Sequence, residues 1–301
     1  MSKHIVNIAA ALSGLVWAAS SALAQEKIPV VATFSILADM TQRVGGDRVA
    51  VQALVGPEQD AHVFQPSPAA AAAVSKARVV ISNGFGFEGW MERLISSSGY
   101  KGAIVVATAG LTPLKPDEEH QNDPSNADPH AWQNATNALT YAENIRAGLC
   151  AADTEGCETY TNNARAYAAE LLALDSDIKA RIGALPSDKR KVITSHDAFG
   201  YFAQAYDVTF MAPTGISTDS EASAKDVAKL ISQIKSEKVT ALFVENISDA
   251  RLMEQIARET GVQIGAVLYS DALSKADGPA STYLDMMRYN ARELTKAMAG
   301  S

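Results

Sequence analysis

The strongest constraint on the fold is a regular alternation of short apolar runs with longer stretches whose apolar residues recur at helical spacing. Apolar runs typical of strands occupy residues 28–34, 49–55, 79–82, 103–106, 191–195, 208–211, 241–245 and 263–268. Strands that alternate with helices form mainly parallel sheets covered by helices. The sequence therefore predicts an α/β fold with two lobes, one from each half of the chain.

Helices are predicted between the strands, at residues 37–44, 67–77, 135–149, 159–182, 224–237, 250–260 and 283–299. The helix at 159–182 is the longest, and it ends before Gly183 and Pro186. We therefore expect an N-terminal lobe over residues 25–150, a linking segment with the long helix over 151–186, and a C-terminal lobe over 187–301.

The first residues indicate export from the cytoplasm. Lys3 precedes an apolar run over residues 5–19, and a small-x-small site ends at Ala24. This order is typical of a secretory signal peptide over residues 1–24, with cleavage after Ala24. The apolar run is short for a membrane-spanning helix, and no cysteine follows the cleavage site to carry a lipid. We expect a soluble exported protein.

Charge argues against one large class of partners. The formal net charge is −8, and no cluster of lysine and arginine interrupts the acidic balance. A chain of this kind is a poor binder of phosphate backbones, so nucleic acid is excluded as a partner.

The two cysteines of the chain, Cys150 and Cys157, are separated by six residues. In an oxidising compartment such a close pair most often forms a disulfide bond. The spacing is too wide for the Cys-x-x-Cys motif of redox or metal sites. We therefore predict a structural disulfide.

Four residues suggest a metal site. Three histidines and an aspartate lie in distinctive segments: His62 in DAHVFQPSP, His130 in DPHAW, His196 in TSHDAF and Asp271 in LYSDAL. Imidazole nitrogens with one carboxylate oxygen suit a four-coordinate zinc ion. His62, His196 and Asp271 follow predicted strands, and the carboxyl ends of parallel strands border the binding crevice of α/β sheets. We expect two ligands from each lobe and an ion between them.

Each residue alone has an ordinary explanation, because a loop histidine is usually a surface or packing residue and Asp271 could cap a helix. Four such segments together favour a shared site. His120 lies in the polar stretch 115–128, which is predicted to be an exposed loop. It could acquire metal for the site, but a solvated loop histidine is the simpler interpretation.

The chain resembles the substrate-binding proteins of ABC importers for zinc and manganese, whose two α/β lobes are joined by one long rigid helix. The matching segments cover both lobes in order and lie at residues 61–68, 128–132, 195–202, 215–225, 243–246 and 269–289. The resemblance implies that His62, His130, His196 and Asp271 bind the metal and that residues 159–182 form the connecting helix. It also implies a periplasmic monomer that delivers its ion to the membrane permease of an ABC importer.

Manganese-type members generally carry a carboxylate at the position of His196. Three imidazoles favour zinc over the harder manganese ion, so the expected ligand is Zn²⁺, although copper or nickel could also bind in vitro. Zinc-type members often have a long histidine-rich loop, whereas residues 115–128 contain His120 alone. A periplasmic zinc-donating protein could replace such a loop.

Further residues could support the site. Glu245 and Glu221 could orient the imidazoles by accepting a ring proton. The alternative functions are a secreted zinc-dependent hydrolase, a metal-binding adhesin that shares the same site, and a manganese-binding variant of the importer protein. The hydrolase would need a coordination position open to water and a nearby general base, and the chain lacks the His-Glu-x-x-His motif. A closed set of four protein ligands favours binding over catalysis.

Overall fold

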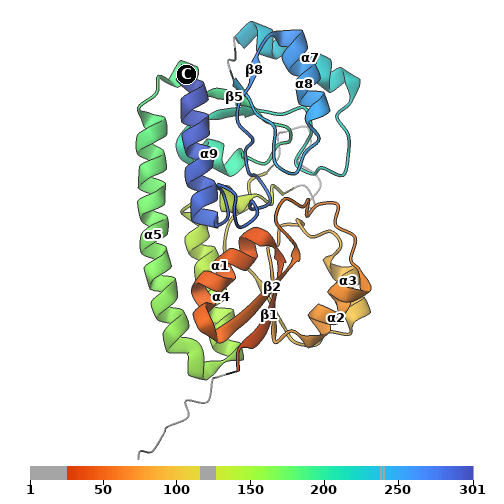
Figure 1. Ribbon diagram of the computed structural model, residues 1–301, viewed down its shortest axis with the longest axis vertical. Helices are drawn as coiled ribbons and strands as arrows, with labels where there is room; N and C mark the ends of the chain where they lie inside the picture. The colour runs from red at the N-terminus through yellow and green to blue at the C-terminus, as the bar shows by residue number, and fades with distance from the viewer. Residues whose placement is uncertain (1–25, 116–126, 238, 240, 301) are drawn as a thin grey trace, which may run out of the picture.

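The computed structural model describes residues 26–115, 127–237, 239 and 241–300, so the predicted signal peptide and His120 lie outside the described residues. The α/β fold is confirmed: each lobe contains one four-stranded parallel sheet with helices packed around it (Figure 1). No helix among the described residues is long and apolar enough to cross a membrane.

The sheet of the N-terminal lobe has the strand order β2-β1-β3-β4. Its strands match the predicted runs: β1 Ile28–Phe34, β2 Val49–Val55, β3 Val79–Ser82 and β4 Ala103–Val106. The accompanying helices are α1 Ser35–Gly45, α2 Pro68–Lys76, α3 Met91–Ser98 and α4 Asn137–Ala152. Helix α2 begins as its sequence predicts, because the Ser67 side chain accepts a hydrogen bond from Ala70 N and Pro68 occupies the first turn.

The sheet of the C-terminal lobe repeats the same relative order, β6-β5-β7-β8. Its strands are β5 Lys191–Ile193, β6 Thr209–Met211, β7 Ala241–Leu242 and β8 Gln263–Ile264, and its helices are α6 Gly200–Tyr206, α7 Ala224–Glu237, α8 Ala250–Thr260 and α9 Tyr283–Met298. The predicted strands at 241–245 and 263–268 are longer than β7 and β8. Beyond the ladders the two segments remain neighbours, since Glu245 pairs with Leu268 in an isolated bridge.

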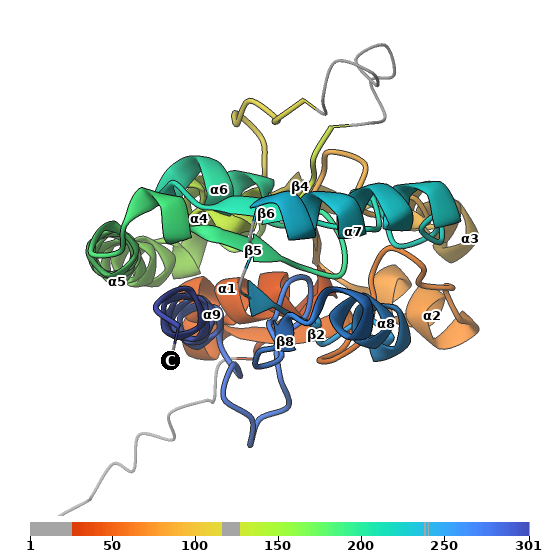
Figure 2. The ribbon, with the colours of Figure 1, turned by 90° about the horizontal axis from the view of Figure 1, so that it is seen from above.

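A single long helix, α5 Cys157–Gly183, runs along both lobes. It packs against α1 and α4 of the N-terminal lobe and against α6 and α9 of the C-terminal lobe. Figure 2 shows α5 and α9 on one side of the molecule, with α2 and α3 on the opposite side. Helix α5 has 27 residues, with Glu158 in the first turn and Arg181 in the last turn, the charge order that the helix dipole favours.

The predicted disulfide is confirmed. Cys150 near the end of α4 is bonded to Cys157 at the start of α5. The bond closes the tight turn between the two helices, whose short 3-10 segment spans Thr154–Gly156. It therefore fixes the direction in which α5 leaves the N-terminal lobe.

Candidate metal centre

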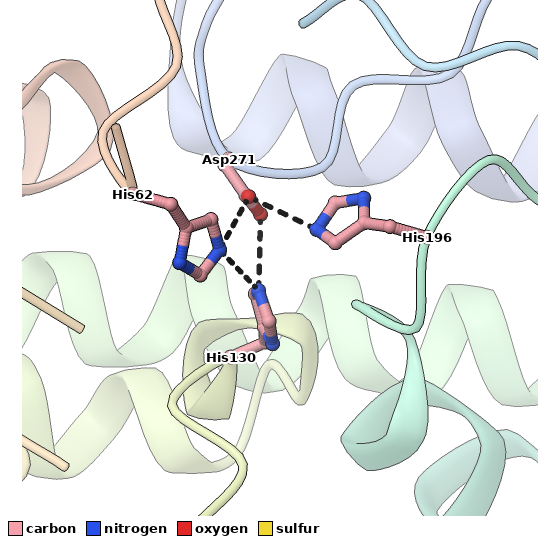
Figure 3. A group of neighbouring side chains, drawn as sticks. All are labelled: His62, His130, His196 and Asp271. Atoms are coloured by element: carbon pink, nitrogen blue, oxygen red, sulfur yellow. Dashed lines mark hydrogen bonds and ion pairs between the residues drawn. The ribbon is translucent and has the colours of Figure 1, made fainter. Parts of the chain in front are cut away.

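The four predicted site residues come together between the two lobes (Figure 3). His62 lies in the turn after β2, and His130 directly precedes the short helix Ala131–Gln133. His196 follows β5, and Asp271 follows the bridge between Glu245 and Leu268. One nitrogen or oxygen from each residue lies within 4.8 Å of the others.

The carboxylate of Asp271 lies among the three imidazoles. Its oxygens are 3.3 Å from His62 Nε2, 3.5 Å from His130 Nε2 and 3.2 Å from His196 Nε2. The Nε2 atoms of His62 and His130 are 3.2 Å apart. The same ring nitrogen of all three histidines therefore faces one small volume.

The site is almost completely enclosed. The side chains of His130 and Asp271 are 0% exposed, and that of His62 is 5% exposed. Both carboxylate oxygens of Asp271 and Nε2 of His196 lack a well-aligned hydrogen-bond partner among the described residues. Buried polar atoms are rarely left unsatisfied, and a cation held between these atoms would satisfy them together.

Two further carboxylates contact the outer sides of the imidazole rings. Asp128 Oδ1 lies 2.8 Å from His130 Nδ1 and also accepts a hydrogen bond from His130 N. Glu245 Oε2 lies 2.6 Å from His196 Nδ1, and Glu245 Oε1 accepts a hydrogen bond from His196 N. A proton on Nδ1 leaves Nε2 free as a metal ligand, so these contacts orient both rings toward Asp271.

Asp128 was not among the residues singled out from the sequence. Its signal is the Asp-x-His spacing, which lets an aspartate accept a hydrogen bond from the backbone two residues later. The same spacing occurs at Asp60, whose Oδ1 accepts a hydrogen bond from His62 N.

The ionisable groups of the site strongly affect one another. Burial alone would lower the pKa of His130, but Asp271 and Asp128 outweigh it and raise that pKa to about 9. Burial likewise opposes the charge of His196, yet Glu245 and Asp271 raise its pKa well above the usual range. Burial would raise the pKa of Asp271, whereas His130 and His196 hold it well below its usual range. An incoming metal ion must therefore displace protons from the histidines.

Aromatic rings support the histidines on the N-terminal side. Trp132 lies 5.3 Å from the His130 ring, and Phe87 contacts the His62 ring edge-on at 4.7 Å. Phe87 follows a turn in which Gly84 and Phe85 adopt positive φ, and it is fully packed. The contact between Phe87 and His62 could not be predicted from the sequence, because the turn that positions Phe87 lies outside the segments that contain the site histidines.

The segment around Asp271 is bonded to both lobes. Ser270 O accepts hydrogen bonds from Trp132 Nε1 and Gln133 Nε2 of the N-terminal lobe, at 2.9 and 2.8 Å. On the C-terminal side, Asn246 Nδ2 donates to Ala272 O. Although Asp271 belongs to the second half of the chain, hydrogen bonds hold it against the lobe that carries His62 and His130.

The second suggested supporting residue, Glu221, lies elsewhere. It is exposed on the loop before α7, and no hydrogen bond or ion pair between described residues joins it to the four site residues. It lines an open cavity to which His196 also contributes.

Known proteins share this fold and sequence. Residues 30–297 match the family ZnuA, described as zinc-uptake complex component A, periplasmic. The chain is 34% identical over 271 residues to the iron-binding protein YfeA of Yersinia pestis, covering 90% of this chain and 86% of that protein. It is 31% identical to the manganese ABC transporter substrate-binding lipoprotein of Streptococcus gordonii, covering 91% of this chain and 89% of that protein. Among solved structures, the periplasmic zinc-binding protein TroA of Treponema pallidum aligns with a TM-score of 0.85 and 28% identity, covering 90% of this chain and 99% of that one.

The chain belongs to the ZnuA family. It is the extracytoplasmic metal-binding component of an ABC importer and not an enzyme, so the hydrolase interpretation is ruled out. The centre between the lobes is a divalent-metal site of three histidines and one aspartate.

Proposed function

We propose that this protein captures Zn²⁺ in the periplasm and delivers it to the permease of its ABC importer, with His62, His130, His196 and Asp271 as the four ligands. In this proposal residues 1–24 are removed on export, and the mature monomer has lobes at 25–150 and 187–301 joined by the linking segment 151–186. Asp128 and Glu245 hold two of the imidazoles in position.

The donor set is the observation that supports zinc. Three imidazoles and one carboxylate suit a borderline ion better than manganese, which prefers oxygen ligands. Zinc bonds of 2.0–2.1 Å in a tetrahedron place neighbouring ligand atoms about 3.3 Å apart. Four of the contacts among these residues measure 3.2, 3.2, 3.3 and 3.5 Å, close to that spacing, and all four ligand atoms lie within 4.8 Å of one another.

Manganese or iron is the second candidate, because relatives named for these metals share about a third of the sequence. The two candidates differ in the metal that binds under competition. Protein purified from its own periplasm should contain zinc in one-to-one ratio by elemental analysis, and buffered zinc should displace manganese in equilibrium titrations. Manganese or iron as the main metal in both measurements would overturn the zinc assignment.

A variant gives a sharper test of why zinc is preferred. Replacing His196 by glutamate exchanges a nitrogen ligand for oxygen, but the new carboxylate would face Glu245, which lies 2.6 Å from His196 Nδ1. The suitable variant is therefore His196→Glu combined with Glu245→Gln, compared with Glu245→Gln alone. We expect the ratio of zinc to manganese affinity to fall at least tenfold between them. An unchanged ratio would show that the third imidazole does not set selectivity.

The proposal also includes a supply of zinc from a periplasmic donor protein, since the stretch at 115–128 contains one histidine, His120. His120→Ala should leave the equilibrium zinc affinity unchanged. If loading from free zinc slows in this variant, His120 itself acquires the ion and a donor is unnecessary. A donor is supported if a periplasmic protein loads the wild type faster than buffered zinc does.

A further inference from the structure

Segment 212–260 of the C-terminal lobe has few ties to the N-terminal lobe. By contrast, α6, which follows His196, is bonded to that lobe, because Tyr201 Oη donates to Asp128 O and Ala135 N donates to Tyr206 Oη. One face of the C-terminal sheet, with Val192 and Ala241, belongs to the large core that also includes the N-terminal lobe, α5 and α9. The opposite face, with Ile193 and Leu242, packs against α7 and α8 in a separate small core. Figures 1 and 2 show α7 and α8 on the side of this lobe away from α5. His196 therefore stands where the large core, which includes α6, meets the separate small core of α7 and α8.

The loop between β6 and α7, residues 212–223, connects this unit to the site. Thr214 pairs with His196 in an isolated bridge, and Gly215 O accepts a hydrogen bond from Asp197 N. Thr218 Oγ1 then donates a 2.6 Å hydrogen bond across the lobes to Asp60 Oδ2. Among the hydrogen bonds and ion pairs between described residues, this is the one that joins segment 212–260 to the N-terminal lobe.

Asp60 carries the connection on to a second histidine. While Oδ2 accepts from Thr218, Oδ1 accepts a 2.9 Å hydrogen bond from His62 N. A continuous set of contacts thus runs from His196 through the loop to Asp60 and His62. It joins the one histidine of the C-terminal lobe to a histidine of the N-terminal lobe.

The same residues border a route to solvent. A cavity of about 510 Å³ is lined by Asp60, Thr218 and His196, together with exposed residues such as Glu221 and Asp249. By contrast, the segment of Asp271 is fixed to the N-terminal lobe, since Leu273 N donates to Ser35 Oγ and Leu273 O accepts from Glu58 N. Because the 212–223 loop contributes much of the cavity lining, movement of this loop would open the site toward the cavity.

We propose that the hydrogen bond between Asp60 and Thr218 is a latch that holds the 212–223 loop over the metal centre and slows release of the ion. The release claim rests on the proposed function. Asp60 acts as a positioning residue, because it accepts hydrogen bonds from His62 N and from Thr218 of the 212–223 loop and is not one of the four metal-site residues.

The test is Thr218→Val, which removes the hydroxyl and keeps the shape of the side chain. Release of bound zinc into excess chelator, followed by stopped flow, should become about tenfold faster, the factor that one hydrogen bond to a charged acceptor corresponds to. The association rate should stay within about twofold, because an open loop does not hinder arrival. Thr218→Ser should restore slow release. Ser217→Ala is the matched control, because it removes a hydroxyl that accepts an exposed hydrogen bond from Asp219 N within the same loop, and it should release zinc at the wild-type rate.

A double-mutant cycle separates the latch from a general loosening of the loop. Asp60→Ala should also accelerate release, and adding Thr218→Val to it should produce no further acceleration, since the shared contact is already gone. Equal release rates for Thr218→Val and wild type, or full additivity of the two changes, would overturn the latch.

A measurement without metal distinguishes failure of the latch from failure of the proposed function. In metal-free protein, amide hydrogen exchange in residues 214–222 should be faster in Thr218→Val than in the wild type. Equal exchange in the two proteins overturns the latch whatever the metal. A wild-type protein that binds no zinc overturns the proposed function and the release claim, while the exchange data still decide whether the hydrogen bond holds the loop.

Discussion

Replacing Glu245 by glutamine tests how the protein prepares His196 for metal binding. Glu245 accepts from His196 N through Oε1, at 2.9 Å, and lies 2.6 Å from His196 Nδ1 through Oε2. Glutamine has one acceptor oxygen, so one of these two donors would face an amide NH₂ group. Losing a hydrogen bond to a buried charged group costs about 1.5–3 kcal/mol, or roughly a 10- to 150-fold loss of affinity. This range agrees with the roughly 10- to 100-fold effect of removing carboxylates that support metal-bound histidines.

Zinc affinity of Glu245→Gln should be measured by competition with a chelator at fixed pH. The comparison variant is Glu221→Gln, which removes an exposed carboxylate of the same lobe and should change the affinity less than about threefold. Circular dichroism should show that both variants are folded. A folded Glu245→Gln variant with affinity within threefold of wild type would refute the orienting role, and an equal loss in both variants would assign the effect to general charge.

Three other perturbations have defined outcomes. Asp271→Ala removes the carboxylate that contacts all three imidazoles, so zinc affinity should fall about 100-fold or more. Circular dichroism should show that the metal-free variant is folded, and wild-type affinity in this variant would remove Asp271 from the ligand set. Because the pKa of His130 is raised to about 9, zinc must displace the proton of His130 at neutral pH. Zinc affinity should therefore rise about tenfold per pH unit for each proton released. Calorimetry in buffers of different ionisation enthalpy measures this release, and a result without proton release would contradict the prediction. The same raised pKa means that protonated His130 stabilises the metal-free fold fully below about pH 6.5, and that this contribution is lost as the pH rises through about 9. Cys150→Ser opens a short loop and should lower the free energy of unfolding by about 2–3 kcal/mol with no change in zinc affinity, and an affinity loss would show that the α4–α5 turn reaches the site.

The N-terminal strands could be predicted to the residue, whereas the C-terminal strands could not. In β1 and β3 the apolar run and the hydrogen-bonded ladder coincide. After β7, Phe243 and Val244 continue the apolar run because both are buried, and Phe243 N still donates to Ile193 O while Val244 O accepts from Leu268 N, but the regular strand ends at Leu242. An apolar run reports burial and does not report where the regular ladder ends. Helix α6 Gly200–Tyr206 was missed because seven residues are too few for a helical period to show.

The candidate site divides in the same way. Its four central residues could be found from the sequence because each lies in a distinctive motif and three follow predicted strands. The residues around them depend on contacts between distant segments: Asp60 reaches Thr218, and Glu245 reaches His196. Glu221 and Glu245 have the same chemistry, but one lies on an exposed loop and the other behind a ligand. Only the fold distinguishes them, because side-chain direction in a loop is not fixed by residue type.

The charges of the centre suggest why it suits a divalent ion. Three carboxylates, those of Asp128, Glu245 and Asp271, contact the buried imidazoles, and uncompensated buried charge is costly. Without an ion, the raised pKa values of His130 and His196 place two protons in the cluster at neutral pH. A bound M²⁺ ion that displaces both protons leaves the total charge unchanged, since two positive charges replace two. A monovalent ion would leave two of the three carboxylate charges uncompensated. Exchange of two protons for one ion therefore matches a charge of two, and the three imidazole nitrogens are the donors on which the zinc proposal rests.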